Sequence, residues 1–414
     1  MNIAIIGSGI SGLTAACLLH RKHDITVFEA NDYVGGHTHT IDVTMGDHTY
    51  AVDTGFIVFN RDTYPNFCRM IDQLEVEWQP TVMTFSVKCE RTGLEYSAHS
   101  LNTFFGQRKN LLSPPFYRML LDIFRFRHQF DRIIHMPPTD MDIGTFLKKY
   151  GYGRRFIEHF IIPMGSSLWS ADPERFTNFP LQMFVRFFRN HGILRVRQPI
   201  QWRVIKGGSH QYVKAMTGLF GNRIRLSCPI RRIVRTPNHV EVTPEGESPL
   251  RFDQVVLAVH SDQALAVLDA PTDAEREILG SIPYQDNLTI LHTDKTVLPE
   301  RKKLWSSWNY LIPARKIARA ALTYDMNILQ SLRAPKEFCV TLNLPDAVNP
   351  SETIDRFEYS HPVYTPEAPA AQKRHAEISG VNRTHYCGAY WGNGFHEDGV
   401  NSALAACRWF DERL

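Results

Sequence analysis

Several defining features are absent from the sequence. No run of 18 or more apolar residues occurs, so no segment is expected to cross a membrane. The seven cysteines are odd in number and widely spaced, and no C-x-x-C occurs, which argues against a disulfide framework or a zinc site and favours a reducing compartment. The formal net charge is only +3, so the overall charge does not point to nucleic acid as a partner. These absences favour a cytoplasmic globular protein without a structural metal.

The size and composition are those of an ordinary globular protein. With 414 residues the chain is too long for a typical single core, and we expect two domains. Hydrophobic residues make up 43% and charged residues 21%, as in most folded proteins. The apolar start of the chain has no preceding basic residue and carries three ordered glycines, so we expect it to be mature structure rather than a signal peptide.

Two glycine-rich stretches lie near the opposite ends of the chain. The first is IAIIGSGISGLTAA, in which Gly7, Gly9 and Gly12 form a G-x-G-x-x-G. After a strand, the first glycine allows a tight turn, the second lets the backbone approach a pyrophosphate, and the third lets the helix pack on the sheet. The helix N-terminus adds free N–H groups and a positive partial charge. Glu29 follows about 20 residues on, where a carboxylate binds ribose hydroxyls and disfavours the 2′-phosphate of NADP. The pattern predicts a dinucleotide site.

The sequence texture predicts how the domains alternate. A strand at 3–6, a helix and a strand at 25–30 open a doubly wound sheet, and residues 100–200 have helical spacing with many aromatics. Alternating segments follow, and a last strand leads to a closing helix from about residue 399. We predict an α/β fold: a Rossmann-like dinucleotide-binding domain with an interleaved α+β substrate domain, made of a mixed sheet and a helical subdomain. The expected segments are 1–85, 204–265 and 376–414 for the dinucleotide domain, 86–203 for the helical part, and 266–375 for the substrate-domain sheet.

Further stretches follow the first turn in a characteristic order. Gly35 and Gly36 come shortly after Glu29, and VDTGFIVFN, VIKGGSHQYV and DQVVLAV lie downstream. With these elements the sequence resembles the flavin-containing amine oxidase superfamily, which includes amine oxidases, protoporphyrinogen oxidases and phytoene-type desaturases. The resemblance covers essentially the whole chain. It implies FAD as cofactor, bound non-covalently because no cysteine lies where covalent attachment would be expected.

The stretch CGAYWGNGFHEDGVNSALAA near the end of the chain resembles the family's C-terminal flavin motif of a strand, a glycine-rich turn and a helix. The resemblance implies that N–H groups around Gly399 and Val400 point at the flavin C2 carbonyl and stabilise negative charge on the ring. Glu397 matches the family's usual glutamate, whereas Asp398 and Ala403 replace residues that are often glycine. One turn is thus expected to hold the pyrophosphate and the other the redox ring.

Carried over residue by residue, the resemblance implies a set of cofactor contacts. His37 stands where the family usually has arginine, residues 52–60 run past the flavin ring, and Ile230 falls where the backbone meets the adenine. The full set is Gly7, Gly9, Ser11, Gly12, Glu29, Gly35, Gly36, His37, Thr38, Gly55, Phe56, Ile57, Ile230, Gly388, Glu397, Gly399 and Val400.

A narrower resemblance concerns the substrate. The stretches PMGSSLWS, FFRNHGIL, WSSWNYL and GFHEDG are similar to those of bacterial amine-oxidase-like flavoproteins of the cyclopropane and methyl-branched fatty acid type. This likeness implies a modified fatty acyl chain as substrate. Amine oxidases often place a lysine near the flavin, but the comparable segment PYQDNLTILHTD contains none before Lys295. Phe395 stands at an aromatic-cage position without a tyrosine hydroxyl. Both departures favour an apolar substrate over an amine.

The candidate catalytic residues are His396, Phe395 and Tyr390. His396 is the most plausible acid or base beside the flavin, with a helix-entry histidine that only bonds the backbone as the alternative. Tyr390 either lines the pocket or packs beside the cofactor. His37 and His39 have no clustered third ligand, so we expect no metal.

Several functions stay open. Without a second G-x-G-x-x-G, we expect hydride transfer from a substrate C–H to the flavin, with electrons leaving to oxygen, a quinone or a carrier protein. The leading hypothesis is an oxidase or desaturase of an apolar substrate. The alternatives are a flavin amine oxidase, a redox-neutral flavoenzyme such as an isomerase, and a non-catalytic FAD-binding partner in a lipid-modifying complex.

A membrane contact is the last hypothesis that the sequence raises. Residues 115–136 interleave aromatics with Arg118, Arg125, Arg127 and Arg132, as in a helix that lies on a membrane surface. An ordinary solvated helix face is the interpretation that the sequence favours, because arginines on one face of a helix are more often simply solvated. The corresponding locations are the cytoplasm and the inner surface of the membrane.

Overall fold

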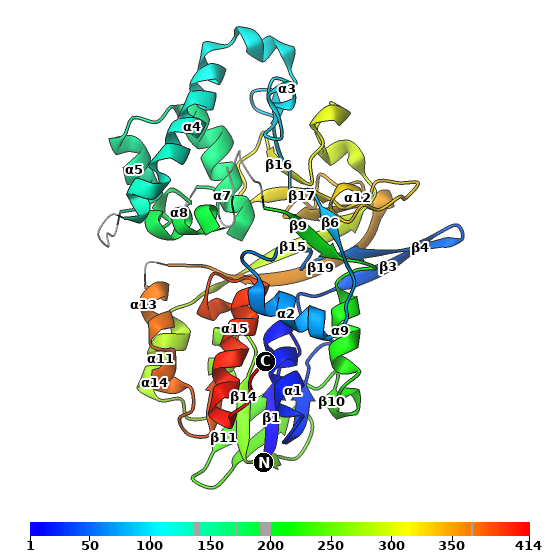
Figure 1. The fold of residues 1–414 in the computed structure, drawn as a ribbon, viewed down its shortest axis with the longest axis vertical. Helices are drawn as coiled ribbons and strands as arrows, with labels where there is room; N and C mark the ends of the chain where they lie inside the picture. The colour runs from blue at the N-terminus through cyan, green and yellow to red at the C-terminus, as the bar shows by residue number, and fades with distance from the viewer. Residues whose placement is uncertain (136–140, 170–171, 175, 191, 193–199, 366) are drawn as a thin grey trace.

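The computed structural model of the protein describes residues 1–135, 141–169, 172–174, 176–190, 192, 200–365 and 367–414. Residue 136 of the expected surface helix and parts of PMGSSLWS and FFRNHGIL lie outside the described residues. The chain forms two lobes along its longest axis, and both termini lie in the lower lobe of Figure 1. The helices are α1 (Ile10–Leu19), α2 (Pro65–Gln73), α3 (Leu101–Phe104), α4 (Pro114–Ile134), α5 (Ile143–Lys149), α6 (Arg154–Phe156), α7 (Ile162–Trp169), α8 (Leu181–Asn190), α9 (His210–Thr217), α10 (Ser261–Val267), α11 (Asp273–Gly280), α12 (Met326–Leu329), α13 (Ala368–Lys373), α14 (His375–Ile378) and α15 (His396–Cys407).

The lower lobe is built on a parallel sheet with the order β10-β2-β1-β14-β20. These strands come from three distant parts of the sequence, as expected for a doubly wound domain interrupted by another. They are β1 (Asn2–Ile6), β2 (Asp24–Phe28), β10 (Ile224–Arg225), β14 (Gln254–Leu257) and β20 (Thr384–Tyr386).

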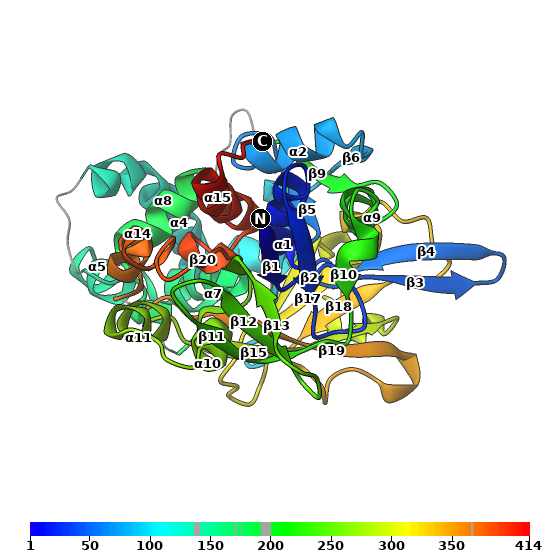
Figure 2. The ribbon, with the colours of Figure 1, turned by 90° about the horizontal axis from the view of Figure 1, so that it is seen from below.

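The two faces of this sheet are covered differently. Ile3 and Ile5 of β1 pack with α1 and α15, whereas Ala4 and Ile6 share a core with the antiparallel sheet β11-β12-β13. This alternation is what a strand buried on both faces requires. Figure 2 shows the parallel sheet between these two layers. The antiparallel strands are β11 (Ile230–Arg235), β12 (Val240–Pro244) and β13 (Leu250–Phe252).

Helix α1 is buried along its entire length, including the small residues Ala15 and Ala16. A helix that is apolar on all sides can only exist inside a layer. It lies on the sheet and contacts both α15 and α9. The glycine turn that precedes it is therefore held rigidly at the carboxyl end of β1.

The upper lobe combines a mixed seven-stranded sheet, in the order β19-β15-β18-β17-β16-β7-β8, with the helical segment α3–α8. Strands β15 and β18 are antiparallel, as the alternating segments predicted. Smaller sheets are the hairpin β3-β4 and the group β5-β9-β6. Their bounds are β3 (Thr40–Met45), β4 (His48–Asp53), β5 (Val58–Phe59), β6 (Trp78–Thr81), β7 (Phe85–Cys89), β8 (Leu94–Ser97), β9 (Trp202–Ile205), β15 (Tyr284–His292), β16 (Trp308–Ile312), β17 (Ala321–Asp325), β18 (Cys339–Leu342) and β19 (Thr353–Pro362). The architecture is the expected α/β fold, while the residue boundaries between the domains stay a prediction.

Candidate functional site

The first glycine turn has the geometry of a phosphate cradle. Gly7 has a φ of +98°, and a Cβ on Gly12 would lie 1.9 Å from the carbonyl oxygen of Gly7. Only glycine fits at these two positions. A Cβ on Gly9, by contrast, would meet no described atom within 4 Å. Open space thus lies over Gly9 at the N-terminus of α1, where no side chain of the described residues caps the helix.

The second glycine pair closes over the first turn. Gly35 and Gly36 have φ values of +126° and +58°, and a Cβ on Gly36 would lie 3.2 Å from the Cα of Gly9. The N–H of Gly35 donates to Ser8 Oγ over 3.3 Å. The loop after β2 and the turn after β1 therefore form two walls of one cradle, while contacts of Gly35 and Gly36 with a cofactor stay a prediction.

The Glu29 carboxylate is buried and already accepts several hydrogen bonds. One oxygen accepts from the N–H and hydroxyl of Ser8, and the other accepts from the N–H and side-chain amide of Asn31, over 2.5–3.1 Å. A carboxylate has about four lone-pair sites, so these four donors fill its capacity. Ribose binding by Glu29 stays a prediction. It requires that the side-chain amide of Asn31 gives up its hydrogen bond to the carboxylate, so that a ribose hydroxyl can donate instead.

Thr38, Gly55 and Phe56 are joined to this loop by backbone pairing. Phe56 donates to the His37 carbonyl over 2.8 Å, and a Cβ on Gly55 would lie 2.1 Å from the same oxygen. Ile57 is buried, and Ile230 begins β11. The segment around Gly55 therefore runs beside His37, but a contact of these residues with a ring is untested.

His37 belongs to a group of histidines between the two lobes. Its ring centroid lies 5.4 Å from that of His361 and 6.0 Å from that of His260. Its Nε2 atom is out of solvent and has no hydrogen-bond partner among the described residues. Burial, with a smaller contribution from the neighbouring histidines, lowers the pKa of His260 and of His361 to about 3, so the rings stay neutral.

The C-terminal turn meets the first turn directly. A Cβ on Gly399 would lie 2.8 Å from a side-chain carbon of Ile10 and 2.9 Å from Ser11 Oγ, so the N-terminal halves of α15 and α1 touch. Val400 is buried in the same core, and Gly388 donates its N–H to Ser402 Oγ over 2.9 Å. The two glycine-rich turns from opposite ends of the chain are thus side by side (Figure 1).

Helix α15 begins three residues earlier than the sequence suggested. The carboxylate of Asp398 accepts the N–H of Phe395 over 3.0 Å, which closes the first turn at His396. The N–H of Gly399 consequently donates to the Phe395 carbonyl over 3.1 Å. The N–H groups of the first turn that lack such helical acceptors belong to residues 396–398, which shifts the expected dipole contact toward the start of the motif.

His396 is packed inside the lower lobe. Its ring stacks on Phe56 with centroids 3.4 Å apart, and Nε2 lies 3.0 Å from both Thr38 Oγ1 and Tyr212 Oη. Thr38 and Tyr212 are also hydrogen-bonded to each other. Burial holds the pKa of His396 well below its usual range. Repulsion from the His37 ring, were both rings protonated, acts in the same direction. A neutral imidazole is thus fixed beside Phe56, and its role as acid or base stays a prediction.

Glu397 points to α2. Its two oxygens accept the N–H groups of Asn66 and Phe67 over 3.0 and 2.9 Å. The carboxylate therefore caps the N-terminus of α2 from a different helix, and burial raises its pKa. A direct contact of Glu397 with the cofactor stays a prediction.

Phe395 contacts the upper lobe, whereas Tyr390 packs within the C-terminal turn. The Phe395 ring stacks on Phe187 of α8 with centroids 4.8 Å apart, and Phe187 lies 4.8 Å from Trp169 of α7. Tyr390 is buried and lies against Trp391, with centroids 5.0 Å apart. Phe395 thus connects the C-terminal turn to the helical subdomain through Phe187.

Residues that the sequence did not single out also shape the site. Asp53 accepts from Thr40, from the N–H and hydroxyl of Ser209 and from Gln330, over 2.6–2.9 Å, and burial raises its pKa to about 6. This buried carboxylate ties β4 to the start of α9 and to the upper lobe. Its place in VDTGF was a usable signal, whereas nothing in the sequence indicated that His260 and His361 would meet His37.

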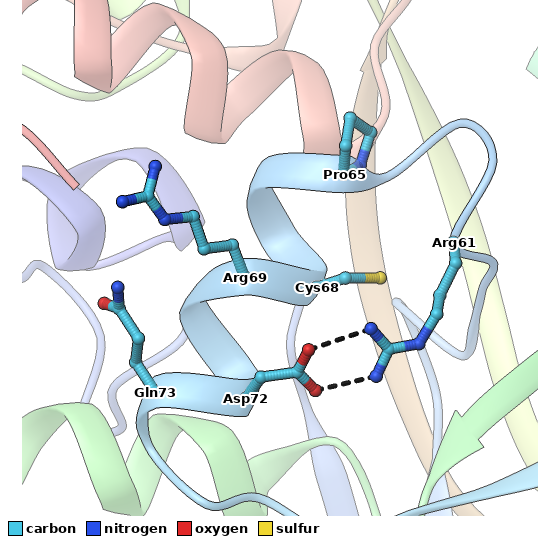
Figure 3. Close-up of a pocket in the computed structure, with 6 residues that line it drawn as sticks. All are labelled: Arg61, Pro65, Cys68, Arg69, Asp72 and Gln73. Atoms are coloured by element: carbon cyan, nitrogen blue, oxygen red, sulfur yellow. Dashed lines mark hydrogen bonds and ion pairs between the residues drawn. The ribbon is translucent and has the colours of Figure 1, made fainter.

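A surface hollow of about 530 Å³ lies beside α2 and does not involve the glycine turns. Arg61 and Asp72 form a bidentate ion pair across it, with two N–H···O contacts of 2.8 Å between the guanidinium and the carboxylate. Arg69 and Gln73 point to the other side of the helix (Figure 3). The hollow is open to solvent, and the ion pair of Arg61 and Asp72 spans it. We therefore assign the cofactor to the glycine turns and not to this hollow.

The residues present fit an FAD molecule. The open space over Gly9, the joined N-termini of α1 and α15 and the unpartnered Nε2 of His37 are features that a bound dinucleotide would use. Within the part of the chain that the structure describes, no three His, Cys, Asp or Glu side chains are grouped to hold a metal ion, and no helix is long and apolar enough to cross a membrane.

Comparison with known proteins agrees with this fit. The model of the family of flavin-containing amine oxidoreductases matches residues 10–320. The protein named as flavin-containing monoamine oxidase AofH of Mycobacterium tuberculosis is 25% identical over 297 residues, which cover 68% of this chain and 62% of the relative. The 1-hydroxycarotenoid 3,4-desaturase of a Flavobacterium species is 38% identical over 93 residues, 22% of this chain and 17% of the relative. The chain thus spans less than two thirds of the length of these curated relatives.

Solved structures share the fold over nearly the whole chain. Cyclohexylamine oxidase from Brevibacterium oxydans has a TM-score of 0.69 at 17% identity, with 99% of both chains covered. The fatty acid isomerase from P. acnes that produces CLA has a TM-score of 0.69 at 16% identity, with 99% of this chain and 98% of that chain covered. At these identities the likeness shows the fold alone.

Proposed function

Because the chain belongs to the family of flavin-containing amine oxidoreductases, whose cofactor is FAD, we propose that it is an oxidoreductase that takes a hydride from an apolar substrate. FAD, when bound, supplies the acceptor for the hydride. The Gly7–Gly12 turn and the N-terminus of α1 hold the pyrophosphate. The first turn of α15 directs its N–H groups at the polar edge of the ring.

The observation that carries the apolar substrate is the aromatic run between the lobes. Phe395, Phe187 and Trp169 form a continuous contact from the C-terminal turn into the helical subdomain. The nearby histidines have lowered pKa values and are neutral, so they offer no charge to a substrate. An alkyl chain gains from burial among aromatic side chains, whereas an ammonium ion would lose its hydration there.

A modified fatty acyl chain, with a cyclopropane ring or a methyl branch, is the substrate class that we favour. The reaction is oxidation or desaturation, and the electrons leave to oxygen, a quinone or a carrier. The likeness to a desaturase of carotenoids, which are also apolar, supports this choice. A redox-neutral isomerase is the second candidate, because a fatty acid isomerase shares the fold.

An anaerobic bleaching screen tests the proposal. The purified flavoprotein is mixed with cyclopropane and methyl-branched phospholipids or fatty acids, their straight-chain counterparts, and a panel of amines, while the visible flavin absorbance is followed. We expect bleaching by the modified lipids and not by the amines. Bleaching by amines alone would make the chain an amine oxidase.

Two other outcomes separate the remaining alternatives. Product formation from a lipid only after chemical reduction of the flavin, with no net oxidation, would identify an isomerase. Bound FAD that no member of the panel reduces or uses would favour a non-catalytic partner in a lipid-modifying complex.

A substrate that is part of a lipid also requires a route from the membrane. Helix α4 (Pro114–Ile134), which contains most of the basic aromatic stretch, is the element that we assign to a peripheral membrane contact.

A further inference from the structure

Exposed apolar side chains are concentrated in one short segment. Among the described residues, 14 large apolar side chains are exposed, and six of them lie between residues 101 and 124. Leu112 is 90% exposed, Leu101 65% and Leu121 64%. We call this set the apolar tip: Leu101, Leu111, Leu112, Tyr117, Leu121 and Phe124.

Helix α4 has two apolar faces, and only one is used in the core. Phe116, Met119 and Phe126 are fully buried against the upper lobe. Tyr117, Leu121 and Phe124 have the i, i+4, i+7 spacing of a second stripe, which is exposed. A helix whose outer face contacts only water would carry polar residues there. The exposed apolar stripe therefore indicates a contact with another molecule.

The tip forms a continuous surface with the turn before α4. The 3₁₀ segment Arg108–Leu112 is held to the helix by the Tyr117 hydroxyl, which donates to the Leu111 carbonyl over 3.1 Å. A shallow hollow of about 420 Å³ opens between them. Figure 1 places this turn at the top of the upper lobe, at the far end of the long axis from the N-terminus and the parallel sheet.

The charge around the tip has one predominant sign. Residues 98–135 hold six of the 46 basic residues of the chain and two of its 43 acidic residues, so the rest of the chain is slightly negative. Arg108 and Lys109 are exposed directly beside Leu111 and Leu112. Asp122, one of the two acids, is buried and paired with Arg118 and Arg125. A basic rim around exposed apolar side chains is complementary to an anionic lipid surface.

We propose that the apolar tip inserts into the interface of an anionic phospholipid bilayer, with Leu111, Leu112 and Leu121 among the acyl chains and Arg108 and Lys109 at the headgroups. The proposed contact is thus shifted from residues 115–136 to residues 101–124, because the exposed apolar side chains begin at Leu101 and Phe126 of α4 is buried in the core. The bilayer as a source of substrate rests on the proposed function, but the binding itself does not.

A vesicle flotation experiment tests the tip. The holoenzyme is mixed, at low and at high salt, with vesicles of phosphatidylcholine alone or with vesicles that also contain about 30% of the anionic lipid phosphatidylglycerol. We expect binding to the anionic vesicles that weakens as salt rises. Leu112→Ser/Leu121→Ser should lower the affinity at least about tenfold, because two leucines no longer bury their apolar area. Arg108→Gln/Lys109→Gln should lower it about fivefold for each charge, on anionic vesicles only.

The matched control is Leu219→Ser/Leu226→Ser, which removes two exposed leucines from the other lobe. It should bind like the unaltered protein, and the thermal midpoint of every variant shows whether it is folded. Equal binding by the tip variant, or no binding by the unaltered protein, would overturn the proposal. A tip-dependent dimer in light scattering, without vesicle binding, would assign the surface to a second copy instead. Failure of lipids to bleach the flavin leaves this binding result unchanged, so the two proposals fail separately.

Discussion

At the scale of single residues, the two outer glycines of the first turn and the middle one have different physical roles. Gly7 and Gly12 are required by close contact and backbone conformation, since a side chain on Gly12 would overlap the Gly7 carbonyl oxygen. Gly9 has a φ of −67°, which any residue can adopt, and free space above it. Gly9 is therefore needed for what binds and not for the fold.

This difference predicts opposite results for two alanine substitutions. Gly9→Ala should keep or slightly raise the thermal midpoint of the apoprotein, because alanine restricts the unfolded chain, yet lower FAD affinity at least about tenfold. Gly12→Ala should lower the free energy of unfolding by about 3 kcal/mol through overpacking. Fluorescence titration with FAD and thermal unfolding of the apoprotein measure the two effects. An apoprotein that is equally destabilised by both changes would contradict the assignment of Gly9.

At the scale of elements, α15 organises its surroundings through its first turn. Asp398 caps the helix itself, and Glu397 caps α2. The start of α15 also touches the start of α1 through Gly399. Three helices thus depend on one short segment of the C-terminal motif.

We predict that Glu397→Gln destabilises the protein by about 1–3 kcal/mol, because an amide cannot accept hydrogen bonds at both positions and leaves a buried N–H of α2 unpaired. The comparison is Glu358→Gln, an exposed glutamate on β19, which should have little effect. Urea unfolding measures both. If amide exchange in α2 is not faster in Glu397→Gln, the capping contact does not hold α2.

At the scale of the whole molecule, the interface between the lobes is lined by titratable groups that are held neutral. The pKa of His260 and of His361 is about 3 in the folded protein, below the ordinary value near 6.5. Their neutral form is common to both states above pH 6.5, so stability is fully present there. As the pH falls below 6.5, the unfolded chain takes up protons that the folded chain does not, and stability is lost.

The loss should reach up to about 1.4 kcal/mol per pH unit for each of the two histidines. Asp53 and Asp398, whose pKa burial raises to about 6, act in the opposite direction as the pH falls from about 6 toward 3.8. We therefore compare thermal midpoints of the unaltered protein and His260→Gln/His361→Gln between pH 7.5 and 5, where the double variant should lose less stability. His128→Gln, at an exposed position of α4, is the control and should follow the unaltered protein. Parallel pH curves for the double variant and the unaltered protein would show that these histidines take up protons equally in the folded and unfolded states, against the lowered pKa values.

The sequence by itself determined the elements whose chemistry is local. The G-x-G-x-x-G turn, the buried strands around it and the existence of a C-terminal helix follow from residue types at fixed spacing, because glycine conformation and hydrophobic alternation act within a few residues. The sequence also indicated that both ends of the chain serve one dinucleotide. Its error in the start of α15 came from Asp398, whose role as a cap depends on a backbone conformation that spacing does not show.

Only the tertiary structure decided which distant groups meet. His37, His260 and His361 come from three segments, and nothing local marks them as neighbours. The direction of Glu397 toward α2 and the choice of which face of α4 is buried also depend on packing, because an amphipathic pattern with two apolar stripes fits the core with either one. Burial and contact are properties of the folded chain as a whole, and they turned a set of residue types into a cradle between two lobes with one exposed apolar tip.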